Sequence, residues 1–160
     1  DVLAEVQKSD PDACLYIIGD GDAEHVDSVK AAIGEKGLES CVFWQKKAPQ
    51  YQMKGVYQQA DLFLLPTEYE IFGMVLLEAM FFRRVVLTTP NGGADMLLRS
   101  GENGLVLEKS DPARWAKTLL DIAADPEKKA RMEQAAYETV IHENTWDALA
   151  DRFLAVYEKR

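Results

Sequence analysis

The sequence predicts an α/β fold in which helices cover both faces of a parallel sheet. Five short apolar runs of strand length recur along the chain, and amphipathic stretches with helical periodicity separate them. This alternation favours parallel strands joined by right-handed crossovers, a Rossmann-like three-layer sandwich of about five strands with extra C-terminal helices. The length of 160 residues suits one domain with a substantial core, so we expect residues 1–160 to form a single domain.

The composition is that of an ordinary soluble protein, with 48% hydrophobic and 28% charged residues. No apolar run is long enough to cross a bilayer, and the first residues lack the pattern of a signal peptide, so we expect a cytoplasmic location. The formal net charge of −9 argues against nucleic acid or anionic membrane as a partner of the whole surface. Phosphate binding would therefore have to rest on backbone amides or a few placed cations.

The first residues have the pattern of an amphipathic helix, with Val2, Leu3 and Val6 as its apolar side. The sequence starts at Asp1, and an alternating α/β chain rarely begins on a crossover helix without a strand before it. We therefore expect a piece of a longer protein, truncated at the N-terminus of this domain.

A turn over residues 9–12 leads into the first expected strand, residues 14–18, and a helix follows over about residues 23–36. Between the strand and the helix, Gly19 and Gly21 form a Gly-x-Gly pattern like that of dinucleotide-binding folds. The third glycine of that fingerprint is missing, and two aspartates in the turn would repel a pyrophosphate. The pattern favours a tight strand-to-helix turn, with direct phosphate contact as the alternative.

The second expected strand covers residues 41–44, and Lys46 and Lys47 follow it at the edge where open α/β sheets bind ligands. The pattern fits two roles equally well: the lysines could provide positive charge to a phosphate, or they could be a solvated surface pair. Because Cys14 and Cys41 each open an expected strand, we expect buried, reduced thiols and no zinc or disulfide framework. The two histidines lie in polar helical stretches and are expected on the surface.

The middle of the chain continues the alternation. An expected helix over residues 50–59 precedes the third strand, residues 62–65, and another helix covers residues 73–80. Glu70 lies in the loop before that last helix and Glu78 lies within it, with seven residues between the two carboxylates. A strand, an acidic turn and a helix start in this order suggest a site for a phosphate-bearing ligand.

The loop and the helix start offer definite chemistry. Free amides near Gly73 and Met74 can hold a diphosphate, helped by the helix dipole. Glu78 can accept a pair of hydrogen bonds from a ribose diol. Glu70 can meet a sugar hydroxyl or stabilise positive charge that develops at an anomeric carbon. On spacing alone, an ordinary strand–loop–helix unit with two solvated glutamates explains the pattern slightly better.

A fourth strand is expected over residues 85–88, then a short helix that ends at Leu98, and a fifth strand over residues 105–107. In the loop after the fourth strand, Gly92 and Gly93 allow the backbone to approach a ligand closely or to take up positive φ.

Three helices end the sequence, and their start signals are Asp111-Pro112, Asp125-Pro126 and Thr145. The last helix carries apolar residues at helical spacing: Trp146, Leu149, Ala150, Phe153, Leu154 and Tyr157. We expect this apolar stripe either to pack on this domain or to serve as a face for another part of the protein.

Taken together, these features closely resemble the C-terminal, donor-binding domain of retaining group 1 glycosyltransferases with the GT-B fold. The resemblance covers almost the full chain, and its most specific signal is the Glu–seven residues–Glu motif of Glu70 and Glu78. The other matching blocks, in the family's order, are Pro11–Gly21, Ala60–Thr67, Asn91–Gly93, Gly101–Val106, Asp111-Pro112 and Thr145-Trp146.

The resemblance implies that a sugar is transferred from a UDP-, GDP- or ADP-sugar with retained anomeric configuration, without a metal or another cofactor. Glu70 would be the catalytic residue beside the donor sugar, and Glu78 would bind the nucleotide ribose. We expect the remaining donor and nucleotide contacts at Gly19, Gly21, Lys46, Lys47, Phe72, Gly73, Met74, Val75, Gly92 and Gly93.

The resemblance also implies parts that this sequence does not contain. These are an acceptor domain and a preceding strand with the Arg and Lys that hold the diphosphate, so the chain alone should not catalyse transfer. The acceptor, a glycan, a lipid or a small molecule, would bind to the missing domain. The full-length protein would be cytoplasmic, with peripheral association with the inner face of the membrane as one option.

The sequence departs from the family at Arg83 and Val85, where Gly and Pro are usual, at Met96, where Glu is expected, and at Gln45, where glycine is common. These departures bear on loop shape and donor preference. They leave a degenerate nucleotide-binding or interaction module open as a second function. A nucleotide-sugar epimerase or a glycan phosphorylase of the same two-domain architecture is a third, and no residue supports it.

Overall fold

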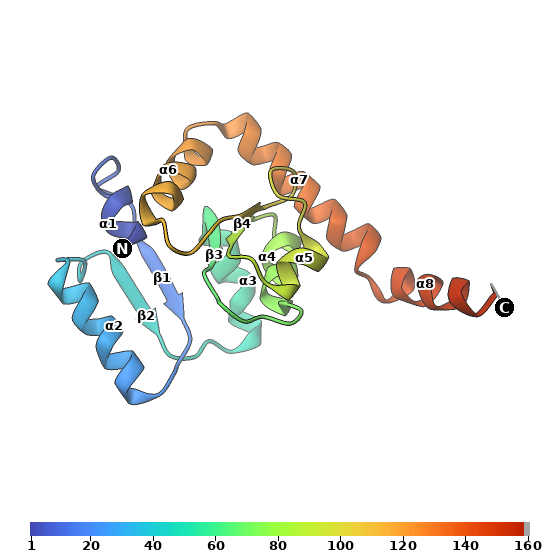
Figure 1. Cartoon of the computed structure of the whole chain (residues 1–160), viewed down its shortest axis with the longest axis horizontal. Helices are drawn as coiled ribbons and strands as arrows, with labels where there is room; N and C mark the ends of the chain where they lie inside the picture. The colour runs from blue at the N-terminus through green and yellow to red at the C-terminus, as the bar shows by residue number, and fades with distance from the viewer. Residues whose placement is uncertain (159–160) are drawn as a thin grey trace. The chain divides into compact units, whose positions relative to one another are not determined.

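The computed structural model describes residues 1–158 and confirms the predicted α/β class (Figure 1). Strands and helices alternate in the expected order. The elements are α1 (Val2–Val6), β1 (Leu15–Ile18), α2 (Ala23–Glu35), β2 (Val42–Gln45), α3 (Gln50–Gln59), β3 (Leu62–Leu65), α4 (Met74–Phe81), β4 (Val85–Thr88), α5 (Gly92–Leu97), β5 (Leu105–Val106), α6 (Pro112–Ala123), α7 (Pro126–Glu143) and α8 (Trp146–Glu158).

The strand pairs are all parallel, as the alternation of strands and helices predicted. β1 pairs with β2, and a second sheet has the order β3-β4-β5. Within the described residues, hydrogen bonding therefore divides the five strands between two sheets, whereas the sequence predicted one sheet of about five. An apolar run identifies a strand but says nothing about which strand lies beside it.

The chain forms two compact units. The first contains residues 1–54 and 111–121, and thus the sheet β1-β2 with α1 and α2. The second contains residues 55–110 and the chain from residue 122 onward, and thus the sheet β3-β4-β5 with α4, α5, α7 and α8.

In the first unit, α2 begins and ends where the sequence indicates. The Asp22 side chain accepts a hydrogen bond from the His25 amide at 2.8 Å and so caps the first turn. Gly37, just beyond the helix, has a φ of 64°, the left-handed conformation of a C-terminal glycine cap. The Asp22 cap supports the reading of residues 19–22 as a tight strand-to-helix turn.

The cysteines fit the expectation in part. Both are free, and Cys41 is buried. Cys14 is exposed, so the prediction of a buried thiol is wrong there. β1 begins at Leu15 and β2 at Val42, so each cysteine precedes its strand by one residue and does not open it.

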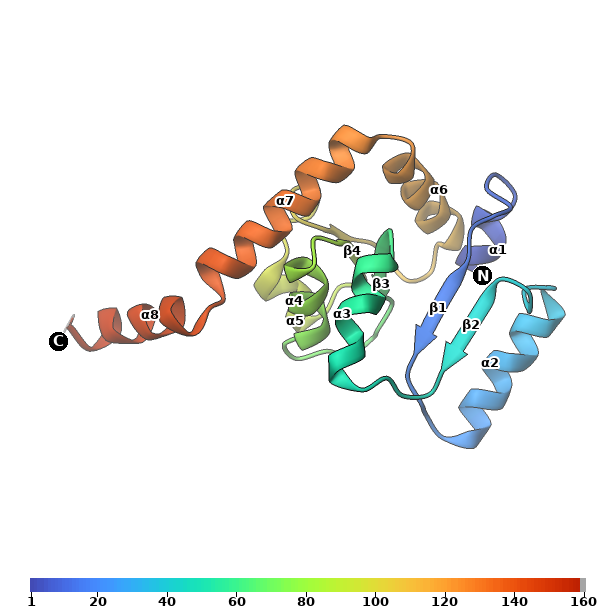
Figure 2. The ribbon, with the colours of Figure 1, turned by 180° about the vertical axis from the view of Figure 1, so that it is seen from behind.

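The core of the second unit lies around β4, whose four residues are all buried. α4 and α7 pack against β4 and against each other, as both views show (Figures 1 and 2). The first three residues of β4, Val85, Val86 and Leu87, are apolar, and the buried Thr88 donates its hydroxyl to the Leu65 carbonyl. The largest fully buried hydrophobic side chains are Leu76, Met80, Val85, Val86, Leu87 and Ile122.

A buried asparagine ties the turn before β5 to α7. The Asn103 side chain is fully buried and donates to the Leu97 carbonyl at 3.1 Å and to Thr139 Oγ1 at 3.0 Å. Its oxygen accepts from the Arg99 amide at 2.6 Å. A buried amide with several satisfied hydrogen bonds fixes the geometry around it, so the Gly-Glu-Asn-Gly block of the sequence has a structural role here.

The last helix, α8, forms as predicted, but its apolar stripe is not packed on this domain. Trp146 is 88% exposed and Tyr157 is 70% exposed, and no described residue of α8 is buried. In both views α8 projects from the end of α7, away from the three-stranded sheet (Figures 1 and 2). Of the two expectations for this stripe, packing on the domain is wrong. Among residues 1–158, no helix has the length and apolar character needed to span a membrane.

Arg83, one of the departures from the family pattern, has a φ of 57° and lies in the left-handed region. The usual glycine there takes this conformation without strain, whereas a residue with a Cβ pays about 1–2 kcal/mol. The Arg83 guanidinium lies 4.0 Å from the centre of the Tyr137 ring and also hydrogen-bonds Gln134, which offsets part of this strain.

We expect Arg83→Gly to be more stable than Arg83→Ala by about 1 kcal/mol, because both lose the Tyr137 contact and only alanine keeps the left-handed strain. Urea unfolding of the two variants measures this difference directly. Equal midpoints for alanine and glycine would show that residue 83 is not held at positive φ in solution.

Candidate functional site

The candidate site lies at the carboxyl end of β3 and β4, where hydrogen bonds tie two loops together. Thr88 Oγ1 donates to the Leu65 carbonyl at 2.8 Å, and Thr89 Oγ1 donates to the Thr67 carbonyl. The sequence reasoning did not single out either threonine. Carboxyl ends of parallel strands form the ligand-binding edge of α/β sheets, so these bonds set the distance between the two site loops.

Asn91 completes this connection. Its side-chain amide donates to Thr88 Oγ1 at 2.9 Å and to the Thr89 carbonyl at 2.7 Å, and its oxygen accepts from the Ala94 amide at 2.9 Å. Asn91 thereby caps α5 and fixes the start of that helix next to β4. An asparagine directly before a helix is a cap signal in the sequence, which could have identified this role.

Gly92 and Gly93 allow the start of α5 to press against the loop that carries Glu70. A Cβ at Gly93 would lie 2.6 Å from the Phe72 carbonyl oxygen, and one at Gly92 would lie 2.9 Å from that of Ile71. Neither glycine has positive φ, so that alternative is wrong. The close approach is made to the protein's own backbone. Their contact with a donor stays a prediction.

Gly73 turns the chain from this loop into α4. Its φ of 76° and ψ of 59° are left-handed, and an added Cβ would lie 2.8 Å from Leu76 Cδ1. No side chain caps α4. Because the first amides of a helix lack intrahelical acceptors, the N–H groups of Met74 and Val75 lie at a positively polarised helix end.

Glu70 is half-buried and turns its carboxylate onto the amides that the sequence assigned to a diphosphate. Glu70 Oε1 accepts hydrogen bonds from the Gly73 amide at 3.0 Å and from the Phe72 amide at 3.3 Å. The two N–H groups therefore converge on one anionic oxygen. A ligand phosphate that used the same amides would have to displace the Glu70 carboxylate from them.

Glu78 extends from α4 toward Tyr57, a buried residue of α3. The Tyr57 hydroxyl, from α3, donates to Glu78 Oε2 at 2.9 Å. Burial raises the pKa of Tyr57, and its hydrogen bond to Glu78 raises it further. Tyr57 and Glu78 lie on different helices, so the spacing of residues could not have shown this pair.

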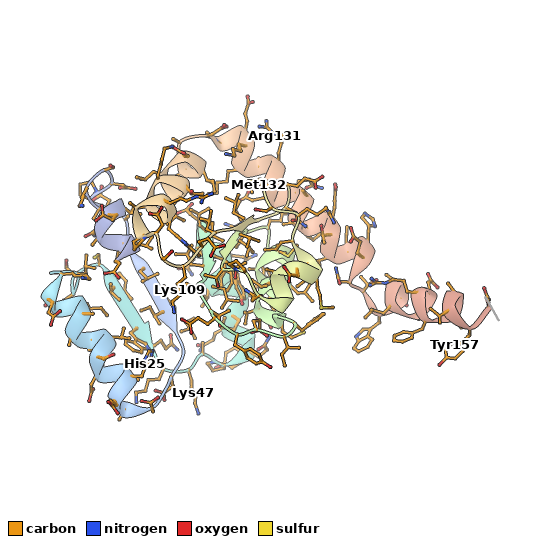
Figure 3. All side chains as sticks on the ribbon, in the orientation of Figure 1. His25, Lys47, Lys109, Arg131, Met132 and Tyr157 are labelled. Atoms are coloured by element: carbon orange, nitrogen blue, oxygen red, sulfur yellow. The ribbon has the colours of Figure 1, made fainter. Side chains whose placement is uncertain are left out.

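An ion pair joins the loop between β3 and α4, which carries Glu70, to the chain after β5. Lys109 follows β5 and pairs with Glu68, and the hydrogen bond from Lys109 lowers the pKa of Glu68. Both side chains are exposed, so the contribution of this pair to stability is small. Figure 3 labels Lys109 among the side chains.

The remaining predicted residues, Gly19, Gly21, Lys46 and Lys47, belong to the first unit. Lys46 Nζ lies 3.6 Å from Asp20 Oδ1, which also accepts from the Gly21 amide at 3.1 Å. Lys47 is exposed after the end of β2 (Figure 3). Glu70, Gly73, Glu78 and the double glycine therefore belong to the second unit. Gly19, Gly21 and the two lysines belong to the first unit.

Comparison with known families gives one match that covers most of the chain. The family model described as glycosyl transferases group 1 matches residues 1–139. A D-inositol 3-phosphate glycosyltransferase of Corynebacterium efficiens is 28% identical over 161 aligned positions. That alignment includes 98% of this chain and 38% of the relative, so the chain spans well under half the length of the curated relatives it matches.

Two solved structures show the same fold. The C-terminal domain of the group 1 family glycosyl transferase LpcC from Francisella tularensis has a TM-score of 0.79 at 21% identity, over 91% of this chain and 78% of that one. The Anabaena protein HepE, crystallised with UDP-glucose, has a TM-score of 0.81 at 21% identity, over 99% of this chain and 44% of that one. At these identities the likeness concerns the fold.

Proposed function

The chain belongs to the glycosyl transferases group 1 family, and we propose that it is the donor-binding half of a retaining glycosyltransferase. Within the intact protein it would hold a nucleotide-sugar while the sugar moves to an acceptor. The observation that carries this proposal is the convergence of the Phe72 and Gly73 amides on a single carboxylate oxygen of Glu70. That geometry suits an oxygen of a diphosphate equally well.

In the proposed complex, the diphosphate replaces the Glu70 carboxylate at these amides and gains the N–H groups of Met74 and Val75 at the start of α4. Transfer breaks the bond between the anomeric carbon and a diphosphate oxygen, so negative charge grows on the leaving diphosphate. Fixed amides stabilise that charge without reorganising. This arrangement needs no metal ion.

Glu70, displaced from the amides, becomes the group nearest to the transferred sugar. As a carboxylate it accepts hydrogen bonds from sugar hydroxyls and stabilises the positive charge that develops at the anomeric carbon. Glu78 accepts hydrogen bonds from the ribose diol. Gly92 and Gly93 line the neighbouring loop. Because they have no side chains, the Glu70 loop can pack directly against their backbone.

We also assign the group in the first unit to the donor. The backbone around Gly19 and Gly21 would contact the nucleoside, and Lys46 and Lys47 would supply the cations that an acidic chain needs near a diphosphate. Lys46 now neutralises Asp20 across 3.6 Å in an exposed pair, a contact weak enough to be exchanged for a phosphate.

The longer relatives motivate the rest of the proposal. Because this chain covers 38% of the Corynebacterium efficiens enzyme, we propose that an acceptor domain and a further strand of this domain lie elsewhere in the intact protein. The acceptor is a glycan, a lipid or a small molecule. The intact protein is cytoplasmic, and a lipid acceptor would bring it to the inner face of the membrane.

Titration of the intact protein with UDP-, GDP- and ADP-glucose by calorimetry tests this function. We expect one of the three to bind at least about tenfold more tightly than the others, since discrimination between bases rests on a few hydrogen bonds. Binding with hydrolysis or transfer of the sugar supports the enzyme. Binding without turnover of any acceptor favours a degenerate nucleotide-binding module, and no binding by any of the three contradicts the proposal.

A further inference from the structure

Tyr57 reaches the Glu78 carboxylate from another helix, α3. Its hydroxyl lies 2.9 Å from Glu78 Oε2. The proposed function uses Glu78 for the ribose but assigns nothing to Tyr57. The contact therefore raises the question of what this tyrosine contributes to a site that it does not line.

The ring of Tyr57 is held so firmly that its hydroxyl has little choice of position. Tyr57 is only 3% exposed. Its ring stacks on Phe82 with the centroids 5.4 Å apart and 15° between the planes, and it meets Phe63 at 5.8 Å and 55°. Phe63 lies in β3 and Phe82 directly follows α4, so the elements on either side of the site loop both fix the ring.

Glu78 is half-buried, and its side chain has more rotatable bonds than the ring of Tyr57. A carboxylate that must meet two neighbouring hydroxyls has to present its oxygens in one plane and one direction. A glutamate left to itself samples several rotamers, and the loss of that freedom on binding weakens affinity. A fixed donor on one carboxylate oxygen removes much of that freedom beforehand.

We propose that Tyr57 is a positioning residue for Glu78: its buried hydroxyl holds the carboxylate in the orientation that meets the ribose diol. Recognition of the ribose thus depends on a residue that does not touch the nucleotide. This inference rests on the proposed function, because it takes the ribose as the partner of Glu78.

The chemistry of Tyr57 suits a permanent donor. Burial, together with the hydrogen bond and the charge of Glu78, raises the pKa of Tyr57 above its ordinary value. The hydroxyl therefore keeps its proton throughout the range in which the protein would be assayed. Its hydrogen bond to Glu78 does not switch with pH and acts as a fixed support.

Tyr57→Phe removes only the hydroxyl and keeps the ring with its stacking. Tyr51→Phe is the matched control, since Tyr51 lies on the same helix, is 80% exposed and loses the same atom. Glu78→Gln removes the charge of the carboxylate itself. The melting temperature of each variant shows whether the fold is kept, with a decrease of about 2–4 °C expected for Tyr57→Phe from one lost hydrogen bond.

The readout is the preference for ribose over deoxyribose. Dissociation constants are measured on the intact protein for the tightest binder among UDP, GDP and ADP and for its 2′-deoxy counterpart. We expect wild type to prefer the ribonucleotide by about tenfold or more, and Glu78→Gln to lose this preference. Tyr57→Phe should bind the ribonucleotide about fivefold to tenfold more weakly and the deoxynucleotide nearly as well as wild type. Tyr51→Phe should match wild type.

Two other outcomes separate this inference from the proposed function. If Tyr57→Phe weakens both nucleotides equally, or neither, while Glu78→Gln loses the preference, Tyr57 is structural and the inference is overturned with the function intact. If wild type shows no preference, or Glu78→Gln keeps it, Glu78 does not bind the ribose and the proposed function is contradicted at that residue.

Discussion

Glu70→Ala is expected to lower the turnover of the intact protein by about 10²–10⁴-fold while a nucleoside diphosphate binds as tightly as before, or more tightly. Turnover and binding respond differently because the Glu70 carboxylate has two places in the proposed reaction: on the amides without ligand, and beside the sugar when the donor is bound. In the structure its carboxylate accepts hydrogen bonds from the Phe72 and Gly73 amides at 3.3 and 3.0 Å. A diphosphate competes with it for those donors, whereas the transferred sugar needs it.

The measurement pairs steady-state turnover with calorimetric binding of UDP, GDP or ADP. Glu68→Ala is the matched control, since Glu68 lies two residues earlier in the same loop and is exposed, with Lys109 as its partner. We expect Glu68→Ala to change turnover by less than about threefold, as an exposed ion pair contributes little. Near-normal turnover in Glu70→Ala would contradict the catalytic role of Glu70.

Glu70→Gln separates charge from geometry in this prediction. The amide oxygen of glutamine can still accept from the backbone of Phe72 and Gly73, so the loop keeps its shape. It carries no charge to stabilise an anomeric carbon that becomes positive. We expect its turnover to fall nearly as far as that of alanine, which would assign the effect to the carboxylate charge.

Much of the fold was predictable because local patterns determine it. Residues 62–65 and 85–87 are apolar runs of strand length, and the structure has β3 and β4 there. Gly37 and Asp125 are cap residues whose positions define helix ends in any context. Each of these signals lies within a few residues of the feature it predicts, which is why the order of elements is confirmed.

Features that join distant segments were not predictable in the same way. The pairing of the strands into two sheets depends on which strands become neighbours, and no local pattern records that choice. The hydrogen bond from Tyr57 to Glu78 joins two helices, and the ring of Tyr57 also stacks on Phe82, which follows α4. Cys14 and Cys41 both lie one residue before a strand, yet only Cys41 is buried, and the local sequence does not distinguish the two.

The candidate site was predictable in its residues and less so in its contacts. Motif spacing placed Glu70 in a loop and Glu78 in the following helix, and the structure has them there. The spacing could not show that the Glu70 carboxylate folds back onto the amides of its own loop. It also left open what the double glycine approaches, because a missing side chain does not reveal its neighbour.

Gly93→Ala is expected to damage the site and the fold together. Its Cβ would lie 2.6 Å from the Phe72 carbonyl oxygen, 2.8 Å from the Phe72 carbonyl carbon and 3.2 Å from the Gly73 nitrogen. These are backbone atoms and cannot rotate away, so the Glu70 loop must shift as a whole. We expect a loss of about 1–3 kcal/mol of stability from overpacking and at least about tenfold weaker binding of the nucleotide-sugar.

Gly55→Ala is the matched control for this prediction. Gly55 lies in α3, and a Cβ there would have no atom within 4 Å. Alanine in a helix interior is favoured over glycine, so this variant should gain about 0.5–1 kcal/mol and bind the donor as wild type does. Urea unfolding and donor titration of both variants give the comparison. If Gly93→Ala binds the donor normally despite a lower unfolding midpoint, the loop tolerates displacement, and the amides of Phe72 and Gly73 do not hold the diphosphate in the observed geometry.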